Sequence, residues 1–197
     1  MTYLFIDTCN AFIVSIIKNR EILYINKDSS NIDTSSKIMP VIDDALKKTN
    51  LTINNIDKIF VVNGPGSFTG IRVGVTIAKT ISYCLNIPLI KLSELELLAT
   101  TPSNTYNVPI IDARRGYVYG AIYDKDLNIY YEETHILFEE LKTKLPNNYN
   151  IVDNYDNIDL IKLISKHEND IPVNPHELKP NYLKNTEAEE KLNDQRV

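Results

Sequence analysis

The stretch that decides the fold reads GPGSFTGIRVG and spans residues 64–74. An apolar run at residues 59–62 precedes it, and a helical pattern of apolar residues follows it to about residue 85. Glycines permit a tight turn and a close backbone approach that larger side chains would block. Ser67 or Thr69 can cap the helix that follows. The sequence therefore predicts a buried strand, a glycine corner and a long helix, in that order.

The glycine corner lacks three common chemical motifs. A P-loop carries Lys and then Ser or Thr after its second glycine, whereas this chain has Ile71 and Arg72. The spacing of its glycines differs from the dinucleotide-binding fingerprint. Pro65 stands where a nucleophile elbow needs its first glycine. The corner is therefore no standard phosphate loop, dinucleotide loop or hydrolase elbow.

Small side chains recur every four residues along the predicted helix, at Gly70, Gly74, Ala78 and Ser82. This spacing places them on one face of the helix. Such a stripe lets another backbone approach closely, either from the same chain or from a partner. The residues alone leave both alternatives open, and packing within the chain is the more common one.

The composition indicates a globular protein without a large basic surface. The chain has 197 residues, of which 43% are hydrophobic and 24% charged, and its net charge is −5. A negative net charge argues against strong binding to nucleic acid by this chain alone. This length allows one large domain or two small lobes.

Two observations predict a cytoplasmic location and no contact with a membrane. The sequence contains no apolar run near the roughly 20 residues of a membrane span, and Asp7 comes too early for a signal peptide. Cys9 and Cys84 lack the spacing of a metal motif or a disulfide framework, so we expect reduced thiols.

The chain contains an internal repeat. Residues 3–6 form an apolar run that ends at Asp7, and a second apolar run ends at Asp112. At both places an apolar strand, a charged turn and another strand follow with the same spacing. We therefore predict a lobe at residues 1–103, a second lobe at residues 104–185 and a charged tail at residues 186–197.

Four segments together resemble the TsaB (YeaZ) family: Ile6-Asp7-Thr8, the glycine loop 64–72, the corner 112–116 and the late segment 180–183. The resemblance covers roughly residues 3–190, and the glycine loop is its most specific part. A duplicated lobe that opens with Asp at a strand corner also resembles the actin, sugar kinase and Hsp70 (ASKHA) superfold. The resemblance implies an α/β, two-lobed fold with duplicated mixed β-sheet lobes. In active members, nucleotide phosphates lie between the two Asp corners.

The resemblance implies a non-catalytic scaffold or activator subunit. Such a subunit pairs with a TsaD-like catalytic subunit, which transfers a threonylcarbamoyl group to the adenosine next to the tRNA anticodon. A TsaE-like ATPase is expected to join this pair, tRNA is expected to be contacted only through the complex, and the chain alone is expected to form a homodimer. The expected contact uses two helices, at residues 36–48 and 68–85. Its expected residues are Ile38, Val41, Ile42, Ala45, Gly70, Gly74, Ile77, Ala78 and Ile81. On this interpretation the small-residue stripe belongs to the subunit contact, and Gly74→Leu would leave a folded monomer.

The resemblance also implies a degenerate nucleotide cleft with no tightly bound cofactor. ATP or ADP is expected only weakly, or at the junction of the complex. Arg114 and Arg115 replace the small and polar residues that kinases use around phosphate, so they are expected to crowd the cleft or to pair with Asp7. The expected cleft residues are Asp7, Thr8, Gly64, Gly66, Ser67, Asp112, Arg114 and Arg115.

No metal site is expected. TsaD-like enzymes carry two metal-binding histidines four residues apart, and the matching stretch here, residues 92–98, contains none. Glu94 and Glu96 in this stretch are expected to face solvent. The three histidines, His135, His167 and His176, are expected to be surface or packing residues. The family also often has His-Ser before its first helix, where this chain has Thr34-Ser35.

The sequence argues against two enzymatic alternatives. An independent ATP-dependent kinase or ATPase of the same superfold would need a glycine-rich adenosine loop in the second lobe, but the chain has only 6 glycines and most lie in residues 64–74. A peptidase would need a nucleophile elbow with its triad or a metal motif, and neither is present. An accessory subunit without catalytic residues is therefore the favoured prediction.

Overall fold

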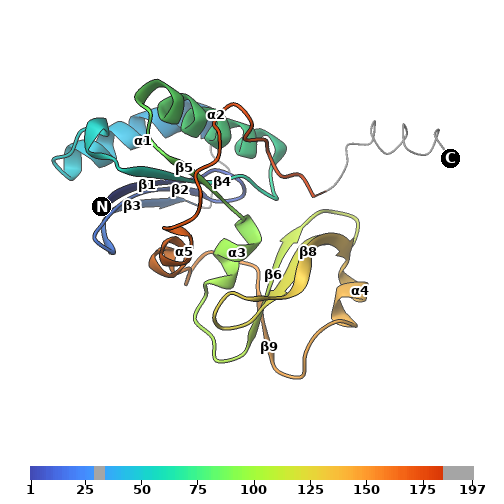
Figure 1. Ribbon diagram of the computed structural model, residues 1–197. Helices are drawn as coiled ribbons and strands as arrows, with labels where there is room; N and C mark the ends of the chain where they lie inside the picture. Colours follow the sequence, from blue (N-terminus) through green and yellow to red (C-terminus); the bar gives the residue numbers. More distant parts are fainter. Residues whose placement is uncertain (29–33, 184–197) are drawn as a thin grey trace, which may run out of the picture.

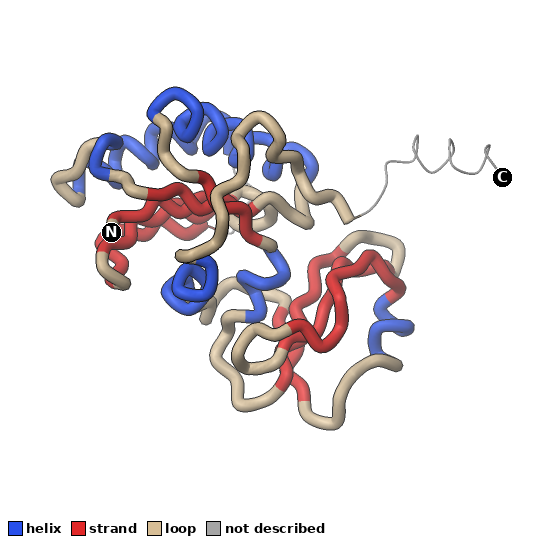
Figure 2. The backbone as a smooth tube through the Cα atoms, in the orientation of Figure 1, coloured by secondary structure: helices blue, strands red, loops and turns tan. Residues whose placement is uncertain are grey.

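The computed structural model describes residues 1–28 and 34–183, which form two β-sheets with flanking helices (Figures 1 and 2). The first sheet has the strand order β3-β2-β1-β4-β5. Strands β1, β2 and β3 are antiparallel neighbours, whereas β4 and β5 run parallel to β1. The strands are β1 (Thr2–Asp7), β2 (Phe12–Lys18), β3 (Glu21–Asp28), β4 (Lys58–Val62) and β5 (Leu89–Leu92).

Helices cover both faces of the first sheet. Helix α1 (Thr34–Lys48) and helix α2 (Phe68–Leu85) lie together on one face, and helix α5 (Leu160–His167) lies on the other (Figure 1). A short 3-10 turn, Ile53–Asn55, precedes β4. Strands β1, β2 and β4 are apolar along nearly their whole length because both faces of the sheet are covered.

The second sheet has the strand order β8-β7-β6-β9. Its strands are β6 (Tyr106–Asp112), β7 (Tyr117–Tyr123), β8 (Ile129–Leu137) and β9 (Tyr149–Val152). Helix α4 (Phe138–Lys142) follows β8 and ends at the C-cap residue Thr143. Helix α3 (Glu94–Ala99) joins the two sheets. Leu97 packs into the first core, and Leu95 packs against the second sheet.

The structure confirms the duplicated, two-lobed architecture. Asp7 pairs with Ile13 across β1 and β2, and Asp112 pairs with Val118 across β6 and β7, so the two hairpins have the same register at their corners. Strand β4 runs parallel to β1, as β9 runs parallel to β6. Each lobe therefore begins with an antiparallel meander and gains a parallel strand beside its first strand.

The chain returns to the first lobe after β9, so the predicted second lobe at residues 104–185 is too long at its C-terminal end. Leu160, Leu163 and Leu178 belong to the first core. The backbone amide of Val173 donates to Leu89 O at 2.9 Å, and that of Asn181 donates to Asn63 O at 2.7 Å. The apolar face of α5 explains the return, because it covers the sheet face opposite α1 and α2. The predicted tail, residues 186–197, lies outside the described residues.

The small-residue stripe packs inside the chain, against the corner that follows β1. Thr8 Oγ1 donates a hydrogen bond to Gly70 O at 2.7 Å. A Cβ on Gly70 would overlap the carbonyl oxygen of Thr8, and a Cβ on Gly74 would overlap Thr8 Oγ1. Ala78 is also fully buried. Close intramolecular packing is therefore the alternative that the structure supports.

Because of this packing, most of the residues that were expected to contact a partner are buried within the chain itself. Six of the nine expected interface residues are covered by the chain itself: Ile38, Ile42, Ala45, Gly70, Gly74 and Ala78. Gly74→Leu would therefore disturb the fold rather than leave an intact monomer. Val41, Ile77 and Ile81 are only partly buried and are still available to a partner. None of the helices in residues 1–28 and 34–183 is long and apolar enough to cross a membrane.

We predict that Gly70→Ala destabilises the protein by roughly 1–3 kcal/mol, the usual cost of inserting a methyl group into a packed interface. Alanine favours a helix over glycine by about 1 kcal/mol, so a loss of stability requires the steric overlap with Thr8. Urea unfolding measures the change. Thr76→Ala, at an exposed position of the same helix, is the control and should change stability by less than about 0.5 kcal/mol. A Gly70→Ala protein as stable as the wild type would contradict the packing.

Candidate functional site

Asp7 ends strand β1 and is fully buried. Its Oδ1 accepts a hydrogen bond from the backbone amide of Cys9 at 2.8 Å, an Asx-type contact that turns the chain away from the strand. The neighbouring residue, Thr8, donates a hydrogen bond from Oγ1 to Gly70 O in helix α2. The Asp7 carboxylate is therefore fixed at the end of β1.

Glu94 faces Asp7 from helix α3. Ser93 Oγ caps this helix by accepting from the amides of Leu95 and Glu96, and the amide of Glu94 donates to Gly64 O at 2.9 Å. The prediction that Glu94 faces solvent is wrong, because its side chain is fully buried. Glu94 is the first residue of α3, and this helix lies between the two lobes.

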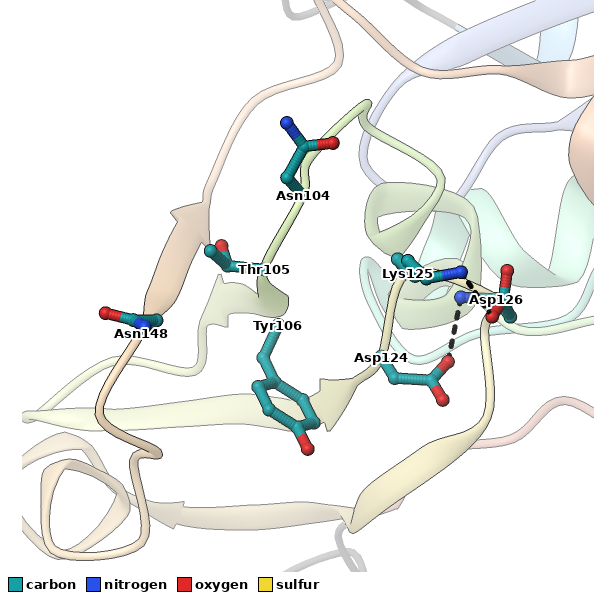
Figure 3. Close-up of a pocket in the computed structure, with 7 residues that line it drawn as sticks. All are labelled: Asn104, Thr105, Tyr106, Asp124, Lys125, Asp126 and Asn148. Carbon is teal, nitrogen blue, oxygen red and sulfur yellow. Dashed lines mark hydrogen bonds and ion pairs between the residues drawn. The ribbon is translucent and has the colours of Figure 1, made fainter.

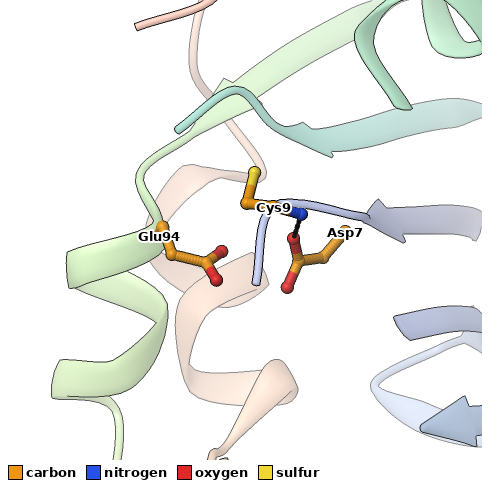
Figure 4. A group of neighbouring side chains, drawn as sticks. All are labelled: Asp7, Cys9 and Glu94. Carbon is orange, nitrogen blue, oxygen red and sulfur yellow. Dashed lines mark hydrogen bonds between the residues drawn. The ribbon is translucent and has the colours of Figure 1, made fainter. Parts of the chain in front are cut away.

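The Glu94 carboxylate has donors on only one of its oxygens. Tyr155 OH donates to Oε1, and Asn10 Nδ2 donates to the same atom at 3.3 Å. No described residue donates to Glu94 Oε2 or to Asp7 Oδ2, and both atoms are buried. Figure 4 shows the two carboxylates pointing toward each other, with Cys9 beside them. One oxygen of each carboxyl group thus faces the other acidic side chain, and a proton carried by one of the two is what can join them.

The shared burial shifts the acidity of these groups. Burial raises the pKa of Asp7 to about 6. Burial, together with the Asp7 charge, raises the pKa of Glu94 well above its ordinary value. Burial and the charges of Glu94 and Asp7 likewise raise the pKa of the Cys9 thiol. Two negative charges this close together are unfavourable, so the two carboxyl groups titrate as a pair that favours sharing one proton.

The glycine corner is filled by the chain itself. Gly64 and Gly66 have φ angles of 119° and 156°, in the region that glycine favours. A Cβ on Gly64 would overlap the carbonyl oxygen of Asn181, and a Cβ on Gly66 would overlap the Asn10 side chain. Ser67 Oγ caps α2 by accepting from the amide of Gly70 at 3.3 Å. These contacts take up space and a helix-capping position that a phosphate would otherwise use.

The second Asp corner is separate from this cluster. Asp112 is exposed, and its Oδ1 accepts from the amide of Arg114 at 2.8 Å. Arg114 and Arg115 are exposed and have φ angles of 67° and 54°. Within the described chain, Asp7 contacts Cys9 and Glu94, so the expected pairing of these arginines with Asp7 is not observed. The structure groups Asp7, Thr8, Gly64, Gly66 and Ser67, and it leaves Asp112, Arg114 and Arg115 at the surface of the other lobe.

Glu96 ties α3 to α5, and the prediction that it faces solvent is also wrong. Lys166 Nζ lies 2.7 Å from Glu96 Oε1, and His167 Nε2 lies 2.9 Å from Oε2. His167 Nδ1 lies 2.7 Å from Asp170 Oδ2. Burial alone would raise the pKa of Glu96, but the hydrogen bonds from His167 and Lys166 lower it. The same contact with Glu96 raises the pKa of His167, and Asp170 adds to the shift.

The other two histidines contact aromatic rings. His135 stacks on Tyr117 at 4.8 Å between ring centroids, and His176 meets Tyr83 edge-on at 4.6 Å. His176 therefore lies against helix α2 of the first lobe rather than within the second sheet.

A separate hollow of about 320 Å³ lies in the second lobe, away from this cluster (Figure 3). Its acidic wall is part of a turn, because Asp124 Oδ1 accepts from the amides of Asp126 and Asn128 at 2.8 Å each. Lys125 Nζ pairs with Asp126 at 2.8 Å. The hollow is lined by Asn104, Thr105, Tyr106, Asp124, Lys125, Asp126 and Asn148. Its charges are thus already paired locally.

The chain is similar to proteins that are named for the biosynthesis of threonylcarbamoyladenosine in tRNA. A family model described as TsaD, tRNA N6-adenosine threonylcarbamoyltransferase, matches residues 30–187. The Bacillus subtilis tRNA threonylcarbamoyladenosine biosynthesis protein TsaB is 39% identical over 132 residues, which are 62% of this chain and 55% of that protein. The Haemophilus influenzae protein of the same name is 34% identical over 124 residues, 60% of this chain and 52% of that protein. The chain thus spans about half the length of the curated relatives that it matches.

Solved structures show the same fold. A Pseudomonas aeruginosa protein described as similar to peptidase YeaZ superimposes with a TM-score of 0.77 at 18% identity, covering 93% of this chain and 99% of that one. YeaZ from Pseudomonas aeruginosa superimposes with a TM-score of 0.74 at 20% identity, covering 92% and 99%. At these identities the likeness shows the shared two-lobed architecture.

We predict that His167 makes the stability of the protein depend on pH. The pKa of His167 in the folded chain is raised above 6.5. Its contribution to the free energy of unfolding is therefore complete below pH 6.5 and is lost as the pH rises through the raised pKa. Replacing His167 by Gln should cost roughly 1 kcal/mol at low pH and should flatten this part of the profile. Urea unfolding across a pH series, with His176→Gln as the control, measures it. Identical pH profiles for wild type and His167→Gln would contradict the assignment.

Proposed function

The chain belongs to the TsaB (YeaZ) family, and from that premise we propose that it is a non-catalytic subunit in the biosynthesis of threonylcarbamoyladenosine in tRNA. Its proposed role is to bind and activate a TsaD-like catalytic subunit, which transfers the threonylcarbamoyl group to the adenosine next to the anticodon. A TsaE-like ATPase is proposed to join this pair, and tRNA is proposed to be contacted through the complex. No catalytic residue is assigned to this chain.

The burial of Asp7 is the observation that carries the non-catalytic role. A nucleotide-dependent enzyme of this superfold needs its first Asp corner open toward the phosphates. Asp7 is instead 0% exposed, and the Glu94 carboxyl group lies against it, so a phosphate has no access to it. Asn181 and Asn10 lie against the glycines of the corner. These contacts favour a chain that binds nucleotide weakly, or only at the junction of the complex, over an independent kinase or ATPase.

The outward surface of α1 and α2 supports the proposed pairing. Met39 on α1 is 51% exposed, and Val41, Ile77 and Ile81 are partly buried hydrophobic residues on these two helices. Ile77 and Ile81 lie one turn apart, so they share one face of α2. Apolar side chains left partly or largely uncovered on two adjacent helices are compatible with a protein interface. We place the contact with the catalytic subunit here, and with it the homodimer contact of the chain alone.

We predict that Met39→Glu weakens binding to the TsaD-like subunit by about tenfold or more, because the interface would bury an unpaired carboxylate. Sedimentation or titration calorimetry with the two purified proteins measures the affinity. Ile129→Glu is a matched control, since Ile129 is also 51% exposed but lies on the second sheet. Binding that survives Met39→Glu unchanged, or that falls equally in both variants, would contradict the placement of the interface.

A further inference from the structure

Asp7, Cys9 and Glu94 form a buried group whose composition the proposed function does not use. Their exposed fractions are 0%, 1% and 0%. Asp7 Oδ2 and Glu94 Oε2 are both buried, and no other side chain or backbone group of the described residues donates a hydrogen bond to either atom. Both carboxylates point into the same space (Figure 4). Buried polar atoms of native proteins normally have a partner. A proton shared by the two carboxyl groups can serve as that partner, and so can a cation bound at the same place.

No basic side chain of the described chain supplies that partner. The ion pairs formed by residues 1–28 and 34–183 include neither Asp7 nor Glu94. Two acidic side chains that lie together in the interior, without a cation, are costly. In the metal-free chain a proton shared by the two carboxyl groups lowers this cost, and a small cation bound between them would replace that proton.

We propose that Asp7, Cys9 and Glu94 bind one divalent cation of the zinc class. One ligand atom of each residue lies within 4.8 Å of the other two, so a point between them is at most about 2.8 Å from each. A contraction of several tenths of an ångström brings these atoms to zinc-ligand distances of about 2.0–2.3 Å. A water molecule would occupy the fourth position of a tetrahedral ion. The absence of histidine at residues 92–98, on which the expectation of no metal site rested, does not bear on this set of ligands.

The donor set selects the type of metal. A thiolate sulfur with two carboxylate oxygens suits zinc or cobalt, whereas magnesium and calcium prefer oxygen ligands in larger coordination shells. Binding releases the protons that the Cys9 thiol and the carboxyl pair carry, and the ion takes their place. Cys9 gives up only a weak bond, because its sulfur lies 3.5 Å from Val62 O. Such an ion would join the corner after β1 to the start of α3.

Cobalt(II) is the probe for this site, because a cobalt–thiolate bond gives a charge-transfer band and a tetrahedral ion absorbs strongly in the visible. The purified full chain is stripped with EDTA, dialysed and titrated with Co²⁺ under reducing conditions. We expect one cobalt per chain with a thiolate band, displaced by Zn²⁺ and not by Mg²⁺. We also expect Zn²⁺ to raise the thermal midpoint of unfolding.

Five variants identify the ligands. Cys9→Ser should abolish the thiolate band, and Asp7→Asn and Glu94→Gln should each weaken cobalt binding at least tenfold. Cys84→Ser is the control for the thiol, because Cys84 is exposed. Asp112→Asn is the control for the carboxylate, because Asp112 has the same register in the second hairpin and is exposed. Both controls should bind cobalt like the wild type.

The folded wild-type chain decides the proposal even if a variant fails to fold. A wild-type protein that shows native circular dichroism but no thiolate band at stoichiometric cobalt would overturn it. So would a band that Cys9→Ser retains or that Cys84→Ser removes. The titration uses the chain without its partner and without tRNA, so a negative result leaves the proposed subunit role untouched.

Discussion

The close contact between helix α2 and the corner after β1 is the constraint on which the rest of the structure depends. Gly70 and Gly74 have no side chain, so Thr8 lies directly against the helix and donates a hydrogen bond to Gly70 O. The contact sets the position of the glycine loop that precedes α2. The loop in turn meets the late segment at Asn181 and the start of α3 through the Gly64–Glu94 hydrogen bond. The contact between α2 and the corner after β1 therefore also positions the glycine loop, the start of α3 and the late segment at Asn181.

The two lobes share a backbone plan but differ at their acidic corners. The hairpins that contain Asp7 and Asp112 have the same register, yet Asp7 is buried and Asp112 is exposed. The difference arises from what packs on each corner. Helix α3 brings Glu94 against Asp7, whereas Asp112 stabilises its own turn through the amide of Arg114. The duplicated fold thus has one buried acidic corner and one exposed acidic corner, an arrangement that agrees with the proposed accessory role.

Local sequence signals predicted the elements well and the long-range contacts poorly. The strand, glycine corner and helix at residues 58–85 follow from apolar runs and glycines, and the repeated Asp corners predicted the two lobes. The burial of Glu94 and Glu96 could not be read from their neighbours, because it depends on Tyr155 and His167, which come much later in the chain. The stripe at Gly70 and Gly74 predicted a close contact but not its partner, which is Thr8 of the same chain. The chain's return to the first core was missed for the same reason.

The formation of threonylcarbamoyladenosine in a reconstituted system tests the proposed role most directly. Purified TsaD-like and TsaE-like proteins, threonylcarbamoyl donor, ATP and tRNA are combined with and without this chain, and the modified nucleoside is quantified by mass spectrometry. The account predicts at least tenfold more modified tRNA when the chain is present, and none when the chain is the only protein. Equal modification without the chain, or ATP turnover and modification by the chain alone, would contradict it.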